Sequence, residues 1–320
     1  MTDLKLGVAL WSQAGEWPAF LTAAQTAERL GYDHVWTWDH LQAIFGDPDQ
    51  PIFEGYTALA AVAQATERVR IGLFVGANPF RNPGLAVKSV TTIDHISGGR
   101  AIMGLGAAWF GHEHQSFGID FGTGFGQRLD WLAEATADAR SLLDGREVTS
   151  KAGGRYAFDH LRTLPPPVQS HLPLMIGGGG ERKTLRIVAR YADMWNVFGM
   201  PETLIHKDAV LRQHCADVGR DPAAIERTVG CKITIRGTEA EAERVRRSIL
   251  EHNRTPLERV EGDHTFWTGT PEQIAETMIG YRRIGFHTFI VELPAPYDAE
   301  TMETLIQVVK PMVESAPVPS

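Results

Sequence analysis

Short, uniformly apolar runs alternate along the chain with longer stretches whose apolar residues recur at helical spacing. Runs of the first kind are typical of buried strands, and stretches of the second kind are typical of amphipathic helices. In the first half of the chain we predict strands at 4–11, 33–38, 69–75 and 100–106, each followed by a helix, at 17–31, 57–67, 83–99 and 126–145. Four β-then-α units therefore follow one another.

The second half continues this alternation less regularly. Residues 155–164 are predicted to form a short hairpin before three prolines, and residues 239–268 hold an extra helix and a polar loop. We interpret the latter stretch as an insertion before the last βα unit. The other elements predicted here are strands at 172–180, 193–199, 227–237 and 286–293, and helices at 181–192, 201–219, 270–285 and 298–314.

About eight strands interleaved with helices limit the possible folds. Strands that are apolar throughout indicate a parallel sheet covered by helices on its outer face. Eight βα units in a chain of 320 residues favour an α/β fold of the closed kind, a (β/α)8 TIM barrel, over an open sheet. Without an internal repeat or a long linker, residues 1–320 are expected to form a single domain, with the insertion at about 239–268.

Composition and charge mainly argue against certain classes of partner. The net charge is −8, and no basic block could supply phosphate contacts, so a nucleic-acid partner is not expected. No apolar run approaches membrane-spanning length and the start is unlike a signal peptide, so no membrane partner and a cytoplasmic location are expected. Cys215 and Cys231 lack a paired spacing, which is typical of structural thiols in a reducing compartment.

In a barrel of this kind the active site lies at the carboxyl ends of the strands. Asp39 and His40 follow the strand predicted at 33–38 without an intervening turn residue. A histidine at a strand end is often only a hydrogen-bonded structural group. Burial beside a carboxylate can also tune an imidazole towards neutral pH, which suits a general acid or base.

Four consecutive glycines follow the strand predicted at 172–180. Glycines let backbone N–H groups approach an anion closely, and the start of the following helix adds a favourable dipole. We expect a phosphate to bind at Gly177, Gly178, Gly179 and Gly180, although a flexible turn would look the same. The segment lacks the G-K-[ST] of a Walker A loop and the fingerprint of a Rossmann nicotinamide site.

The segment 104–114 is a weaker signal. Its small residues Ala107 and Ala108 would allow a flat ring to lie against the backbone. His112 and His114 are possible metal ligands, but their spacing is not that of a helical zinc motif and no cysteine or carboxylate set completes a site. No metal is therefore expected.

Taken together, "VWTWDHL" (35–41), the wider stretch 35–119, "LPLMIGGGG" (172–180) with the residues up to 196, and 269–285 resemble the bacterial luciferase-like monooxygenase superfamily. The resemblance is strongest to its branch dependent on the deazaflavin coenzyme F420, and it spans nearly the whole chain. It implies a (β/α)8 barrel with insertions, and a homodimer, because dimers are common in the family.

The resemblance also implies roles for individual residues. Asp39 and His40 match the strand tip that faces the deazaflavin ring, with Asp39 as a cofactor contact and His40 as a proton-transfer or charge-stabilising residue. The segment Phe74, Val75, Gly76 matches the place where the family carries a non-prolyl cis peptide that supports the ring. The remaining implied cofactor contacts are Asn78, Ala107, Ala108 and the phosphate loop Gly177, Gly178, Gly179 and Gly180.

One position departs from the family pattern. Sugar-phosphate and alcohol dehydrogenases of this branch carry a glutamate proton donor where this chain has Trp109, and Glu113 stands close by as another candidate. The predicted function is hydride transfer between coenzyme F420 and a small organic substrate, against an apolar wall formed by Trp36, Trp38, Trp109 and Phe110. The alternatives are an FMN-dependent monooxygenase that uses oxygen and a partner reductase, and a non-catalytic cofactor-binding protein.

Overall fold

The computed structural model describes residues 4–150 and 152–317, and in this part of the chain eight parallel strands close into a barrel. Closure depends on β10, which pairs with β1 on one side and with β8 on the other. The predicted (β/α)8 barrel is therefore confirmed. The barrel strands are β1 (Lys5–Leu10), β2 (His34–Thr37), β3 (Arg70–Leu73), β5 (Ala101–Gly106), β6 (Leu174–Gly177), β7 (Met194–Val197), β8 (Glu226–Ile235) and β10 (Thr288–Leu293).

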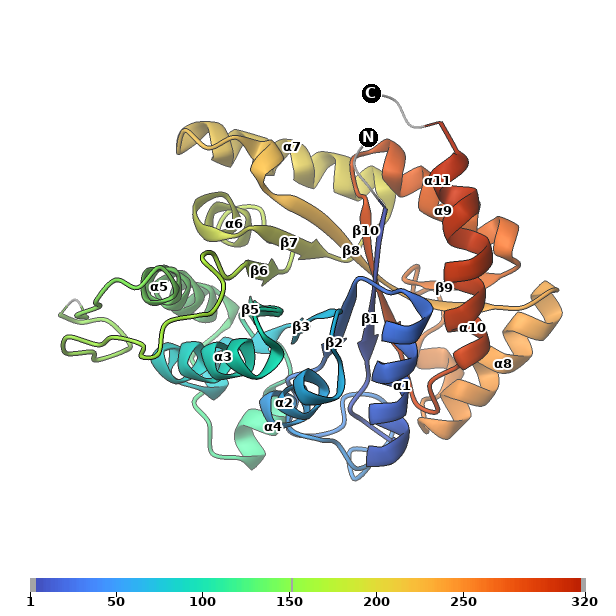
Figure 1. Ribbon diagram of the computed structural model, residues 1–320, viewed down its shortest axis with the longest axis horizontal. Helices are drawn as coiled ribbons and strands as arrows, with labels where there is room; N and C mark the ends of the chain where they lie inside the picture. Colours follow the sequence, from blue (N-terminus) through green and yellow to red (C-terminus); the bar gives the residue numbers. More distant parts are fainter. Residues whose placement is uncertain (1–3, 151, 318–320) are drawn as a thin grey trace.

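Helices surround the barrel and bury their apolar faces against its outer surface (Figure 1). None of the helices in the described ranges is long and apolar enough to cross a membrane. A π-helical turn at Leu305–Val309 joins the last two helices into one rod. The helices are α1 (Trp17–Leu30), α2 (Gly55–Ala65), α3 (Pro83–Ser97), α4 (Gly111–Ser116), α5 (Phe125–Leu143), α6 (Thr184–Tyr191), α7 (Pro201–Asp217), α8 (Glu239–His252), α9 (Pro271–Arg283), α10 (Ala299–Thr304) and α11 (Lys310–Ser315).

Local sequence signals fix several helix ends. α1 ends at Gly31, whose φ of 101° is in the left-handed region that glycine adopts without strain. α3 begins after Asn82, whose side chain accepts hydrogen bonds from the amides of Gly84 and Leu85. At α9 the side chains of Thr270 and Gln273 form a capping box. The cap of a helix depends on residues that are close together in the sequence. The observed helix ends therefore lie within about two residues of the predicted ones.

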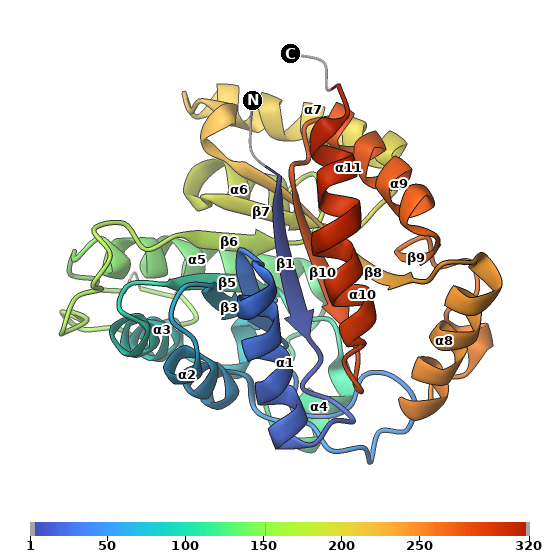
Figure 2. The same cartoon turned by 45° about the vertical axis from the view of Figure 1, so that its right-hand side comes forward.

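Two segments differ from the prediction. The polar loop expected in 239–268 contains a strand, β9 (Phe266–Gly269), which extends the sheet beside the end of β8 (Figure 2). The hairpin within 155–164 is wrong: Leu161 pairs back to Val148 in an antiparallel bridge. The turn between these two residues lies upstream of the segment 155–164, at Gly153, whose φ of 83° is in the left-handed region.

Large side chains fill the barrel interior. Trp36 is completely buried there, with Ile102, Met175 and Ile290 from three other strands around it. Gly72 makes room for the Trp36 indole, since a Cβ at residue 72 would lie 2.5 Å from the ring. The interior is therefore a packed core, and any open space must lie beyond the strand ends. Cys215 and Cys231, which were predicted to be structural thiols, are buried and free.

Candidate active site

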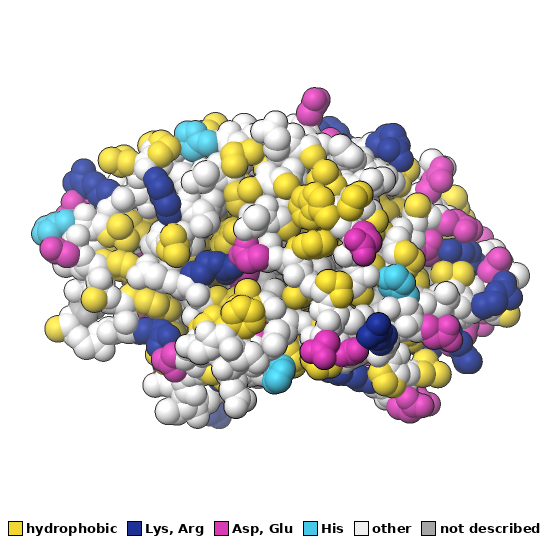
Figure 3. Space-filling model, turned by 90° about the horizontal axis from the view of Figure 1, so that it is seen from below, with side chains coloured by type: hydrophobic (Ala, Val, Ile, Leu, Met, Phe, Trp, Pro, Cys, Tyr) yellow, Lys and Arg dark blue, Asp and Glu magenta, His cyan; other side chains and the backbone are white. Residues whose placement is uncertain are grey.

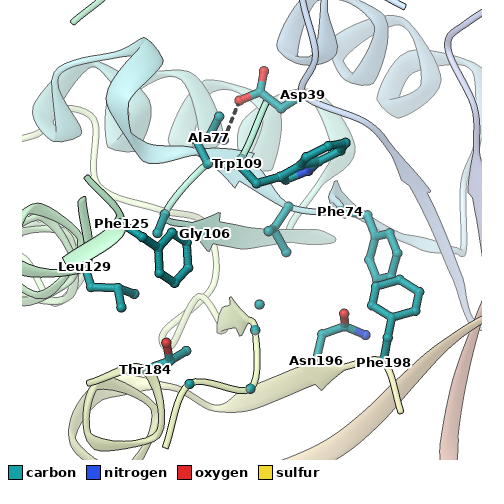
Figure 4. Close-up of a pocket in the computed structure, with 18 of the residues that line it drawn as sticks. Asp39, Phe74, Ala77, Gly106, Trp109, Phe125, Leu129, Thr184, Asn196 and Phe198 are labelled. Atoms are coloured by element: carbon teal, nitrogen blue, oxygen red, sulfur yellow. Dashed lines mark hydrogen bonds between the residues drawn. The ribbon is translucent and has the colours of Figure 1, made fainter. Parts of the chain in front are cut away.

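A cavity of about 340 Å³ opens at the carboxyl ends of β2 to β7, with a short strand β4 (Gly76–Ala77) on its wall (Figure 4). Figure 3 looks onto this face of the molecule, where hydrophobic side chains gather in patches across the middle. The cavity brings together nearly all candidates chosen from the sequence. Its wall includes Asp39, His40, Phe74, Val75, Gly76, Ala107, Ala108, Trp109, Glu113, Gly177, Gly178, Gly179 and Gly180.

Asp39 is buried and ties the tip of β2 to the segment after β3. Its carboxylate accepts two hydrogen bonds from the Arg81 guanidinium, at 2.7 and 2.8 Å, and one from the amide of Ala77 at 2.8 Å. Arg81 also pairs with Glu54, and its guanidinium lies 4.7 Å from the ring centroid of Tyr56. Burial alone would lower the pKa of Arg81, but the charge and hydrogen bonds of Asp39, together with the charges of Tyr56 and Glu54, outweigh burial and raise that pKa. Asp39 is thus a fixed, ion-paired carboxylate on the cavity wall.

His40 is held by a different carboxylate. Its Nδ1 lies 2.9 Å from Oε1 of Glu113, while Oε2 of Glu113 accepts a hydrogen bond from the amide of Leu41 at 2.8 Å. The carboxylate that contacts this imidazole is therefore Glu113, and not the neighbouring Asp39, which pairs with Arg81. An ionised carboxylate can only accept hydrogen bonds, so Nδ1 of His40 donates in this contact. Within the described part of the chain, Nε2 has no hydrogen-bond partner, and His40 lines the cavity.

The short helix α4 explains this contact. Glu113 lies in its first turn and is only 1% exposed, so its carboxylate is placed beneath the tip of β2. Trp109, just before the helix, is 58% exposed and its ring centroid lies 5.8 Å from that of His40. Glu113 therefore holds His40 from its buried side, and Trp109 lies next to the His40 ring at the exposed rim of the cavity.

Only part of the expected apolar wall lies at the cavity. Trp109 lines it, but Trp36 and Trp38 do not, because their side chains turn into the closed barrel core. The indole of Trp38 donates a hydrogen bond to buried Glu292 at 3.1 Å. Phe110 packs behind His40 at 6.3 Å between ring centroids and is not part of the wall. The exposed aromatic rings at the rim are instead Trp109, Phe125 and Phe198.

The floor of the cavity is the side chain of Val75, which follows a cis peptide bond between Phe74 and Val75. The cis bond expected in this segment is therefore present. Val75 lies between two glycines: a Cβ on Gly106 would be 2.7 Å from Val75 Cγ2, and one on Gly177 would be 2.8 Å from it. Larger residues at either position would displace this apolar floor.

The glycine loop lies at the far end of the cavity, before α6. Its shape is fixed by hydrogen bonds to its carbonyl groups: the indole of Trp195 donates to Gly178 and the ammonium of Lys207 donates to Gly179, at 2.9 and 2.7 Å. Within the described ranges, the amides of Gly179 and Gly180 have no protein acceptor. These free donors, with a lysine nearby and no side chains in the way, fit a phosphate group.

Two predicted candidates lie elsewhere. Asn78 is buried in a short 3-10 helix and donates to the Tyr156 hydroxyl at 3.1 Å, so it does not line the cavity. His114 packs between Phe80 and Phe121, with ring centroids 4.8 and 4.4 Å away, and burial lowers its pKa. Among the residues that the structure describes, no group of three or more potential ligands could hold a metal ion.

The sequence reasoning also missed several residues of the site. Arg81, which pairs with the wall residue Asp39, follows β3 in the segment 76–83, which the strand-end rule does select, and its charge among apolar neighbours is a usable signal. The missed wall residues come from strand ends, from helices and from the segment after β7, and the closed barrel brings them to the cavity. They are Ala77, Gly106, Phe125, Leu129, Thr184, Asn196 and Phe198.

Comparison with known proteins identifies the relatives of this chain. A family model described as luciferase-like monooxygenase matches residues 4–288. An FMNH2-dependent dimethylsulfone monooxygenase of Pseudomonas putida is 25% identical over 306 residues, which are 82% of this chain and 79% of the relative. A putative coenzyme F420-dependent oxidoreductase of Mycobacterium tuberculosis is 27% identical over 215 residues, 60% of this chain and 56% of the relative.

Among solved structures, an F420-dependent secondary alcohol dehydrogenase in complex with an F420–acetone adduct superposes with a TM-score of 0.83. It is 19% identical, and the match covers 98% of this chain and 99% of that one. At this identity the likeness concerns the fold alone. The relatives thus include oxidoreductases and monooxygenases that differ in their cofactors.

Proposed function

The chain belongs to the luciferase-like monooxygenase family, and we propose that it transfers a hydride between coenzyme F420 and a small organic substrate. The family membership supports an oxidoreductase or monooxygenase; the deazaflavin and the reaction are our proposal. The observation that carries it is the His40–Glu113 pair, an imidazole held by a buried carboxylate at a cavity whose glycine loop suits a phosphate.

A bound deazaflavin would supply a carbon centre that gives or accepts a hydride, and each such turnover requires a proton to be moved as well. In this chain Nε2 of His40 would accept or deliver that proton. Glu113 holds Nδ1 at 2.9 Å, so the imidazole keeps one orientation, and the buried carboxylate would stabilise the ring when it becomes positively charged. His40 would thus be the catalytic residue and Glu113 its positioning residue.

Other residues would bind the cofactor. The apolar side chain of Val75 would support a ring system from one side, and Ala107 and Ala108 leave room beside it. The free amides of Gly179 and Gly180 would hold the phosphate. Asp39, with its charge taken up by Arg81, would accept a hydrogen bond from the cofactor without placing a free negative charge beside it.

The rim indicates the substrate class. Trp109 is 58% exposed and Phe198 is 40% exposed, and no unpaired cation of the described chain lines this part of the cavity. A small, uncharged and largely apolar substrate fits such a wall better than a sugar phosphate. We expect activity with a ketone and alcohol pair, an enone or an imine.

An FMN-dependent monooxygenase is the second candidate. It is favoured by the monooxygenase of Pseudomonas putida, whose similarity extends over 82% of this chain. FMN also ends in a phosphate, so the glycine loop suits either cofactor.

Equilibrium titration with coenzyme F420 and, separately, with FMN tests the proposal, with cofactor fluorescence as the readout. We expect tight binding of the deazaflavin and weak binding of FMN. His40→Ala should lower turnover by about a hundredfold or more while changing cofactor affinity little, because general acid–base catalysis contributes that much. Preference for FMN, or full turnover by the variant, would refute the proposed function.

A further inference from the structure

A row of cationic side chains lies along α6 and the turn that precedes it, on a protein whose net charge is −8. Arg182, Lys183, Arg186 and Arg190 line one wall of a groove of about 240 Å³, and residues of α5 line the other. The helices α5 and α6 are neighbours on the outside of the barrel (Figure 1). We call this feature the α6 groove.

The charges in the α6 groove are largely uncompensated. Lys183 pairs with Asp130 at 2.6 Å, but Arg182, Arg186 and Arg190 are exposed and have no carboxylate partner within residues 4–150 and 152–317. Arg186 and Arg190 lie one turn apart on the same face of α6, where like charges destabilise a helix, and Arg182 lies in the turn just before the helix.

Several exposed arginines elsewhere in the protein are paired: Arg244 and Arg247 of α8 with glutamates of the same helix, and Arg254, which follows that helix, with Asp47. Others, such as Arg29 and Arg283, also have no carboxylate partner among the described residues, but they do not form a row. What distinguishes α6 is a row of three such arginines at four-residue spacing. It is the arrangement expected where a negatively charged ligand completes the pairing.

The α6 groove adjoins the cavity of the candidate active site. Leu129 of α5 lines both of them. Figure 4 places Leu129 and Phe125 on the same side of the cavity as Thr184, which is the first residue of α6 and follows the glycine loop. A ligand with its phosphate at Gly179 and Gly180 could therefore extend across Leu129 onto the arginines.

We propose that the α6 groove binds the anionic tail that coenzyme F420 carries beyond its phosphate, a chain of linked glutamates. This inference rests on the proposed function. FMN ends at its phosphate and has nothing to place in the groove. Arginine suits such a tail because its planar guanidinium binds a carboxylate through two parallel hydrogen bonds. The groove would then favour the deazaflavin over FMN without any contact to the ring.

The test compares two preparations of the deazaflavin, one with several glutamates and one with the glutamates removed. Their dissociation constants are measured by fluorescence, at low and high salt, for the wild type and for the triple variant Arg182→Gln, Arg186→Gln, Arg190→Gln. A control variant, Arg244→Gln, Arg247→Gln, Arg254→Gln, changes the net charge equally on a distant surface. Thermal unfolding checks that each variant is folded.

We expect the wild type and the control variant to bind the long-tailed form about tenfold more tightly, the size given by two or three exposed ion pairs. The difference should disappear in the α6 variant and in high salt. If the wild type binds both forms equally, the inference is overturned but the proposed function is not. The same holds if the α6 variant keeps its preference for the long-tailed form. If neither form binds, the proposed function is refuted, and the inference with it.

Discussion

Replacing Glu113 by glutamine should move a proton from one nitrogen of His40 to the other. In the wild type the two oxygens of Glu113 accept hydrogen bonds from two donors, Nδ1 of His40 and the amide of Leu41. A glutamine has one oxygen and one NH2 group, and the backbone amide of Leu41 can only donate. The glutamine oxygen must therefore face Leu41, which turns its NH2 group towards His40.

Nδ1 then has to accept a hydrogen bond, and the neutral ring carries its proton on Nε2, at the cavity side. Glu113 is 1% exposed, so water cannot easily replace the lost interaction. A hydrogen bond to a charged group contributes about 1.5–3 kcal/mol. If that stabilisation is lost in the transition state, in which the imidazole ring becomes positively charged, turnover falls by about 10- to 100-fold.

Two measurements check this prediction. Nitrogen NMR of the imidazole rings, with His40→Asn used for assignment, reports the tautomer without any substrate. Stopped-flow reduction or oxidation of the deazaflavin reports turnover. Glu251→Gln, the same substitution at an exposed position of α8, is the matched control. Wild-type turnover together with an unchanged His40 tautomer would refute the role of Glu113 as positioning residue.

Three further outcomes follow from the structure. Asp39→Asn should lower the free energy of unfolding by about 3 kcal/mol, since Arg81 would lose its buried partner; an unchanged urea midpoint would contradict this. Gly177→Ala should weaken cofactor binding in a fluorescence titration, because its Cβ would push Val75 into the cavity, and a wild-type dissociation constant would show that the floor is not used. Burial lowers the pKa of His34, so below about pH 6.5 the unfolded chain binds more protons than the folded one. The melting temperature should therefore fall with pH, and less steeply in His34→Gln; equal slopes would contradict this assignment.

The fold was largely predictable because its signals are local. Apolar runs mark the strands, and caps such as Asn82 and the pair Thr270–Gln273 mark helix ends. The strand-end rule also selected Asp39 and His40, which both line the cavity. It could not show which carboxylate meets the imidazole, because side chains of adjacent residues at a strand tip point in different directions.

The remaining contacts depend on tertiary structure. α4 has only six residues and no clear periodicity, so nothing in the sequence places Glu113 under a strand tip that lies far earlier in the chain. Trp36 was assigned to the substrate wall because it lies near His40 in sequence, but its side chain turns into the core. The pairing of residues 266–269 with β8 was missed because a four-residue strand in a polar stretch gives too short a pattern.

Closure of the barrel has a consequence for how the protein is made. β10 fills the gap between β1 and β8, and its residues 288–293 pair with residues 5–10 from the other end of the chain. During synthesis on the ribosome, the edges of β1 and β8 that pair with β10 stay without this partner until β10 has emerged. Such edges invite pairing with other chains, and contacts so distant in sequence form slowly. The nascent chain should therefore be most prone to aggregate, and most dependent on chaperones, just before this strand is released.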